Sequence, residues 1–337
     1  MKAIYDVPAP AKLNLFLHIT GRRTDGYHLI QSVFMLIDWC DTLHFELRTD
    51  GQISRADIVN NTAGGDASIT STTAAALPDD DLTVRAAKAL KLACGTPLGV
   101  HISLEKRIPQ QAGMGGGSSD AASCLLALQR LWGVNLPRHE LMALAGRLGA
   151  DVPFFLFGGN AWVEGVGEQM SPITLPAADF LVVKPPQGVS TPLIFAAPEL
   201  KRDTETATIE GFAERQKTMV FGFGRNDLQP VASEIYPAIN QSLDWLAVQG
   251  LSGKMTGSGS AVFAHLPQGG YPDSFGAVGK DTQTVVQHGG DGGSGSGSGS
   301  DGHGCLGGKI GGQLSGQSSG WIVRKCRNLR AHPLVGW

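Results

Sequence analysis

Charge, aromatic side chains and long apolar runs are all scarce in this sequence. Charged residues make up 17% of its 337 positions, aromatic residues make up 7%, and the formal net charge is −3. A chain of this balance presents no basic stripe for a nucleic acid, and no window reaches the roughly 20 consecutive apolar residues that span a bilayer. Asp6 and Lys12 interrupt the apolar stretch that a signal peptide would need. We therefore expect a cytoplasmic protein that acts without nucleic acid or membrane, on a small molecule or another protein.

Cysteine is scarce as well. Its five positions are odd in number, widely separated and without CxxC spacing: Cys40, Cys94, Cys124, Cys305 and Cys326. Such a set favours neither a disulfide framework nor a zinc site. The His and Asp residues of "HGGDGGSGSGSGSDGHG" lack the rigid spacing of a metal cage. We expect no metal held by protein side chains alone.

The pattern of apolar residues predicts an α+β fold. A chain of 337 residues exceeds the size at which one hydrophobic core usually stops growing, so two domains are expected. Alternating or continuous apolar residues predict strands over residues 11–21, 32–47, 99–109 and 180–186. Helical spacing predicts helices over residues 79–94, 118–133 and 137–150.

Residues 269–320 break this pattern. Nineteen of the chain's 46 glycines fall there, and periodic apolar structure disappears. A segment of this composition cannot bury enough apolar surface to offset its ordering entropy, so a flexible, disordered insertion is one interpretation. A shifted reading frame, restored near Trp321, is the other, because ordinary composition returns there in "GWIVRKCRNLRAHPL".

A glycine-rich loop, "QQAGMGGGSSDAAS", precedes a predicted helix. Free amides at a helix N-terminus, beside the positive end of the helix dipole, favour a phosphate. Ser118 and Ser119 could cap the helix and offer hydroxyls to a phosphate or its magnesium. No Walker lysine follows the glycines, and Ser118 occupies the third glycine position of the dinucleotide fingerprint. A flexible turn whose serines only cap the helix is the plain alternative.

A third phosphate-loop pattern fits better. Residues 109–122 resemble the nucleotide loop of the GHMP kinases, the family named for galacto-, homoserine, mevalonate and phosphomevalonate kinases. "GRRTDGYH", "LGADVPFF", "RNDLQPVA" and "MTGSGSAVFA" resemble the subgroup that phosphorylates 4-diphosphocytidyl-2-C-methyl-D-erythritol in isoprenoid synthesis. The likeness covers residues 5 to about 266 and, more weakly, 321–337.

The resemblance implies a two-domain GHMP kinase fold with the active site between the domains. An N-terminal ATP-binding domain would cover residues 1–160 and a C-terminal α/β sandwich domain residues 161–337. It further implies ATP and Mg2+ as cofactors, a substrate bearing cytidine diphosphate, and transfer of a phosphate to that substrate's 2-hydroxyl. We expect a monomer or a weak homodimer.

Two residues are the catalytic candidates. Lys12 lies in an apolar strand pattern, where an unpaired ammonium is costly, and Asp151 follows a helix-ending turn. The resemblance gives Asp151 the role of accepting a hydroxyl proton, with Lys12 steadying the charge. A surface lysine whose stem covers apolar surface, and an aspartate that only caps local backbone, are the alternatives.

The remaining site residues also come from the resemblance. Asn14 should share a strand face with Lys12, Tyr27 and Phe195 should stack on a cytosine, and His28 should bond its edge, with core packing or a surface turn as the alternatives. The residues expected around the nucleotide are Lys106, Pro109, Gly113, Met114, Gly115, Gly116, Gly117, Ser118 and Ser119. Gly257 and Ser258, in a second glycine–serine turn, should complete the substrate site.

Other functions stay open at this point. A homoserine- or mevalonate-type GHMP kinase is one, and a non-catalytic nucleotide-binding protein disabled by the 269–320 segment is another. An NAD-dependent dehydrogenase is the weakest, because the fingerprint glycines do not match.

Overall fold

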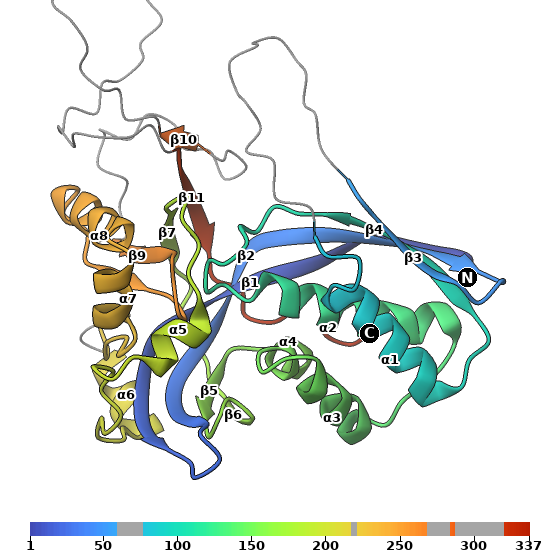
Figure 1. Cartoon of the computed structure of the whole chain (residues 1–337), viewed down its shortest axis with the longest axis horizontal. Helices are drawn as coiled ribbons and strands as arrows, with labels where there is room; N and C mark the ends of the chain where they lie inside the picture. Colours follow the sequence, from blue (N-terminus) through green and yellow to red (C-terminus); the bar gives the residue numbers. More distant parts are fainter. Residues whose placement is uncertain (59–76, 217–220, 268–283, 287–319) are drawn as a thin grey trace, which may run out of the picture.

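The computed structural model describes residues 1–58, 77–216, 221–267, 284–286 and 320–337. Two sheets lie side by side, each with helices packed against it (Figure 1). The expected strands and helices are all present, and the α+β fold class is confirmed. Among the described residues, no helix is both long and apolar enough to cross a membrane.

The first sheet is built around two long antiparallel strands. Its strands are β1 (Ala3–Arg22), β2 (His28–Arg48), β3 (Ile53–Asp57), β4 (Gly99–Glu105), β5 (Ala161–Glu164) and β6 (Gln169–Pro172). They follow the order β3-β4-β2-β5-β6, with β1 paired to β2. Helices α1 (Leu82–Cys94), α2 (Gly116–Trp132), α3 (Arg138–Leu148) and α4 (Val152–Phe157) gather on one side of this sheet (Figure 1).

The second sheet has the order β10-β11-β7-β9-β8. Its strands are β7 (Asp179–Lys184), β8 (Gly253–Met255), β9 (Val262–Leu266), β10 (Thr284–Val286) and β11 (Trp321–Arg327). The helices of this half are α5 (Thr191–Ala196), α6 (Ile209–Gln216), α7 (Gln229–Ile235) and α8 (Ala238–Val248).

The two halves share strands and do not separate cleanly in sequence. Strand β1 contributes to each of three buried apolar clusters, with Val7 in the first, Leu13 in the second and Ile19 in the third. Strands β5 and β6 extend the first sheet beyond residue 160, where we expected the domain boundary. The chain end returns to the first half, where Leu329 donates its amide to Leu36 O at 2.9 Å.

The two interpretations of residues 269–320 fall almost entirely outside the described residues. The described parts of that segment are β10, which pairs antiparallel with β11, and residue 320. The frame-shift hypothesis and the insertion hypothesis therefore both stand as predictions.

Candidate active site

A cavity of about 1170 Å3 lies where the two halves meet. Residues of β1, of the glycine loop before α2, of α5 and of the turn after β8 all line it. The sequence-predicted residues found in its wall are Lys12, Asn14, Tyr27, His28, Gly113, Gly115, Ser118, Asp151, Phe195, Gly257 and Ser258. We call it the main pocket. The catalytic, phosphate-binding and aromatic candidates thus share one cavity, although they come from positions spread along the chain.

Lys12 and Asp151 form an ion pair in the pocket wall. Lys12 Nζ lies 3.6 Å from Asp151 Oδ2, and the side chains are 4% and 33% exposed. Lys12 Nζ also donates to Asn14 Oδ1 at 2.5 Å and lies 4.6 Å from the centre of the Phe34 ring. Asp151 immediately precedes α4 but makes no side-chain capping bond to it. Its carboxylate is therefore free of the local structural role that was the alternative.

The Asn14 side chain is buried and accepts a hydrogen bond from Lys12. Asn14 and Lys12 lie on the same side of β1, as strand alternation predicts. The Asn14 side chain also donates from Nδ2 to Ser32 Oγ at 3.0 Å, while its backbone amide donates to Thr256 Oγ1 at 3.0 Å. Sequence reasoning missed Thr256, although it belongs to the quoted "MTGSGS" turn. Its hydroxyl accepts from the Asn14 amide and so joins the turn after β8 to β1, two residues from Lys12.

The glycine loop and the C-terminal glycine turn touch backbone to backbone. Gly113 has φ +72°, and a Cβ there would lie 2.2 Å from Thr256 O. Gly257 has φ +55°, and its Cβ would lie 2.7 Å from Gly113 O. Ala261 donates its amide to Ala112 O at 3.2 Å. Only glycine permits both this approach and the left-handed backbone, so the two loops form a single wall of the main pocket.

Helix α2 begins at Gly116, and its cap residue is Gly115 at φ +71° with no side-chain capping bond. The expectation that Ser118 and Ser119 cap this helix was wrong, because both lie inside its first turn. Ser118 lines the main pocket. Ser119 is fully buried, and its hydroxyl has no hydrogen-bond partner among the residues that the structure describes. The uncapped first-turn amides near Gly115 are the groups suited to a phosphate.

Lys106 does not line the main pocket. Its ammonium is buried between Asp41 and Asp120, contacting Asp41 Oδ2 and lying 2.7 Å from Asp120 Oδ2. Burial lowers the pKa of Lys106, but the two carboxylates outweigh burial and hold that pKa above its ordinary value. Burial and the neighbouring Asp41 raise the pKa of Asp120 well above its ordinary value.

The structural reason for this placement of Lys106 is that two buried carboxylates, Asp41 and Asp120, require a cation between them. The other nucleotide candidates absent from the pocket wall are Pro109, Met114, Gly116, Gly117 and Ser119.

The far end of the main pocket is aromatic. Tyr27 is 64% exposed, and the rings of His28 and Phe195 lie 5.1 Å apart between centroids. Burial and then the positive charges of Arg202 and Arg22 lower the pKa of His28, which favours the neutral ring. Arg202, which donates from Nε to His28 Nε2 at 3.0 Å, was not predicted. An exposed tyrosine and a Phe–His pair in the wall of one cavity are suited to receiving a flat ring.

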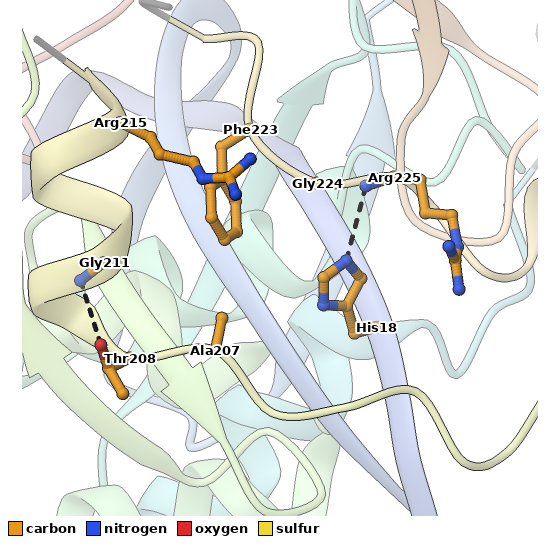
Figure 2. Close-up of a pocket in the computed structure, with 8 residues that line it drawn as sticks. All are labelled: His18, Ala207, Thr208, Gly211, Arg215, Phe223, Gly224 and Arg225. Atoms are coloured by element: carbon orange, nitrogen blue, oxygen red, sulfur yellow. Dashed lines mark hydrogen bonds between the residues drawn. The ribbon is translucent and has the colours of Figure 1, made fainter. Parts of the chain in front are cut away.

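A second cavity, of about 450 Å3, lies beside His18 of strand β1. Figure 2 shows His18 bonded to the Arg225 amide, while the Arg225 guanidinium points away from the cavity. That guanidinium pairs with Asp227 Oδ1 at 2.7 Å. None of the residues predicted for the site lines this cavity, so the main pocket is the candidate active site.

The fold and the pocket define the class of the protein. The sequence pattern of the GHMP kinase N-terminal domain matches residues 81–159, and that of the GHMP kinase C-terminal domain matches residues 204–270. A solved homoserine kinase from Cytophaga hutchinsonii shares the fold, with a TM-score of 0.56 over 79% of this chain and 85% of that chain at 16% identity.

Similarity extends further to one kind of GHMP kinase. A 4-diphosphocytidyl-2-C-methyl-D-erythritol kinase of Polaromonas sp. (strain JS666) is 64% identical over all of this chain and 95% of its own length. One of Polaromonas naphthalenivorans is 60% identical over all of this chain and 97% of its own length. A crystal structure of 4-(cytidine 5'-diphospho)-2C-methyl-D-erythritol kinase is 36% identical and covers 77% of this chain and 88% of that one, with a TM-score of 0.62. The chain belongs to the 4-diphosphocytidyl-2-C-methyl-D-erythritol kinase family of GHMP kinases.

Proposed function

We propose that this protein transfers the γ-phosphate of ATP to the 2-hydroxyl of 4-diphosphocytidyl-2-C-methyl-D-erythritol, giving the 2-phosphate and ADP. The step belongs to the methylerythritol phosphate route of isoprenoid synthesis. The observation that carries the proposal is the Lys12–Asp151 pair, 3.6 Å apart, in the same cavity as an uncapped helix N-terminus and an aromatic recess. Family membership supports the choice of substrate.

Phosphoryl transfer asks mainly for positioning and charge stabilisation. The Asp151 carboxylate is partly exposed and makes no capping hydrogen bond to α4, so it can accept the proton of the attacking hydroxyl. Lys12 is held by Asn14 and has its ammonium in the cavity wall, where it can offset charge on the acceptor oxygen and the transferred group. The loop around Gly115 would receive the phosphates of ATP through its amides.

Magnesium would enter with ATP rather than reside in the protein. Within the part of the chain that the structure describes, no group of three or more His, Cys, Asp or Glu side chains could hold a metal ion. Mg2+ in such enzymes is held by a few oxygen donors together with substrate phosphates. The Ser118 hydroxyl, in the pocket wall at the start of α2, is an oxygen donor of that kind.

The test is ATP-dependent phosphorylation of 4-diphosphocytidyl-2-C-methyl-D-erythritol by the purified protein with magnesium. Asp151→Asn should lower kcat by about 10²–10⁴-fold, while ATP binding stays unchanged. Glu168→Gln is the matched control, because Glu168 lines the same pocket but accepts its hydrogen bond from the Val166 amide at 2.7 Å. Folded protein that binds ATP but transfers no phosphate to this substrate would overturn the proposal.

A further inference from the structure

Arg202 reaches the aromatic end of the main pocket from the segment that follows α5. Its Nε donates to His28 Nε2 at 3.0 Å. Its two terminal nitrogens donate to four backbone carbonyls, which belong to Phe195, Ala197, Pro198 and Leu200. The strongest of these is the 2.7 Å bond to Ala197 O. One side chain thus joins His28 to the stretch of chain that carries Phe195.

The N–H donors of the Arg202 guanidinium determine which ring nitrogen of His28 carries the proton. Arginine has five N–H donors, no acceptor, and a charge that persists at all ordinary pH values. All five donors of Arg202 are matched here, and the one on Nε points at His28 Nε2. His28 Nε2 must therefore carry a lone pair, because a protonated Nε2 would place its own N–H against the N–H of Arg202 Nε and leave no acceptor between them. The neutral ring then has its single proton on Nδ1.

The charges that face His28 agree with a neutral ring. Arg202 donates to the ring, and Arg22 of β1 pairs with His28 across the two strands. Burial and then both positive charges disfavour an imidazolium and lower the pKa of His28. Arg23, Asp25 and Glu168 also line the main pocket. None of them makes a described hydrogen bond to the His28 ring. Nδ1–H is therefore the polar group that the ring has left to offer a ligand.

We propose that Arg202 is a positioning residue for substrate recognition: it fixes His28 as the Nδ1–H tautomer and holds Phe195 beside it. A pyrimidine such as cytosine has a carbonyl oxygen and a ring nitrogen that accept hydrogen bonds, so a fixed N–H donor between two aromatic rings matches it. This role rests on the proposed function, because it assumes that the base enters this end of the pocket. It assigns Arg202 no part in phosphate transfer.

The tautomer can be tested on the parent protein without any turnover. A 15N–1H correlation spectrum of the histidine side chains, with the His28 signals identified by their loss in His28→Gln, should show Nδ1 protonated and Nε2 bare. The ring should gain its second proton only at a pH below that of an unperturbed histidine. A His28 ring with its proton on Nε2, or one that becomes doubly protonated near pH 6.5, would overturn the inference even if the enzyme is active.

Kinetics then test the role in recognition. Arg202→Gln should raise the KM for the cytidine substrate roughly threefold to tenfold, the effect of one lost hydrogen bond, with kcat and the KM for ATP unchanged. The rise should grow below pH 7, because His28 is then free to protonate. Arg202→Lys keeps the charge but loses the planar fork, so it should be equally impaired. Full activity in Arg202→Lys would contradict the geometric argument.

A double-mutant cycle separates this role from a merely structural one. In a His28→Gln background, Arg202→Gln should raise the KM less than it does in the parent protein, because the part of its effect that acts through His28 is already lost and only the part that acts through Phe195 remains. Additive effects, or a fall in kcat at saturating substrate, would mean that Arg202 does not act through His28. Absence of any turnover in the parent protein would instead refute the proposed function, and the spectrum of His28 would still decide the tautomer.

Discussion

Removing the Lys106 ammonium should destabilise the protein. Lys106→Met leaves two carboxylates, Asp41 and Asp120, that are 0% and 2% exposed and lose the cation between them. Breaking a buried ion pair by deleting one partner costs about 3–5 kcal/mol. Two backbone amides, of Arg107 and Ile108, still donate to Asp41 Oδ1, so the loss should stay within that range. The assay is urea unfolding. The midpoint should fall, while the slope of the free energy of unfolding against urea concentration should stay unchanged.

The deficit of Lys106→Met should shrink in acid. The pKa of Asp120 is already raised by burial and by Asp41, and loss of the ammonium raises it further. A carboxyl with a higher pKa in the folded than in the unfolded state binds extra protons when folded, so stability falls as pH rises above about 3.9, the unfolded value. For each such extra proton, the free energy of unfolding falls by about 1.4 kcal/mol per pH unit. The variant should therefore lie nearer the parent at pH 5 than at pH 8.

The control and the refuting outcome are both available in this chain. Lys88→Met deletes a lysine whose pair with Asp80 is exposed on both sides, and its midpoint should match the parent. A stable Lys106→Met that no longer binds ATP would refute the structural account and restore Lys106 to the nucleotide site. A deficit that is the same at pH 5 and pH 8 would refute the role of Asp120.

Two further predictions concern the glycine loop and the reading frame. Gly113→Ala should lower the urea midpoint more than Gly133→Ala, because both positions have positive φ but only Gly113 has Thr256 O at 2.2 Å from the added Cβ; equal losses would show that the close approach is unimportant. At Gly133 the left-handed backbone alone should cost about 1–2 kcal/mol. Resequencing the coding DNA should reveal two compensating frame shifts that bound residues 269–320, and an uninterrupted, well-supported frame would reject that hypothesis in favour of an insertion.

Local patterns predicted the parts of the site that depend on local physics. The left-handed glycines before α2 and the lysine in an apolar strand carry their own chemical signal, whereas the aromatic residues after the turn were predicted from the resemblance to the GHMP kinases. Lys12 and Asn14 needed only strand alternation to be placed together. Most of the residues predicted for the site accordingly line one cavity.

What escaped prediction depends on contacts between distant segments. Arg202 lies in "PELKRD", a stretch with no periodic pattern, and its partner His28 is 174 positions away. Asp41 of β2 and Asp120 of α2 form ion pairs with Lys106, so the charge of this lysine is balanced inside the fold. A carboxylate within the apolar run "LIDWCDTLHF" was the available hint, because a buried charge requires a partner. The sequence could not say which cation would supply it.

The last residues of the chain bear on how the protein is made. Beyond β11, Leu329 O accepts from Asn160 Nδ2 at 2.9 Å, and His332 donates its amide to Gly158 O at 2.9 Å. Asn160 in turn receives the Leu36 amide through Oδ1, so the end of the chain seals an edge of the first sheet. The N-terminal half therefore cannot complete its own surface until the chain beyond β11 has been synthesised. The segment between β9 and β11 therefore separates two parts of the chain that the first sheet needs together.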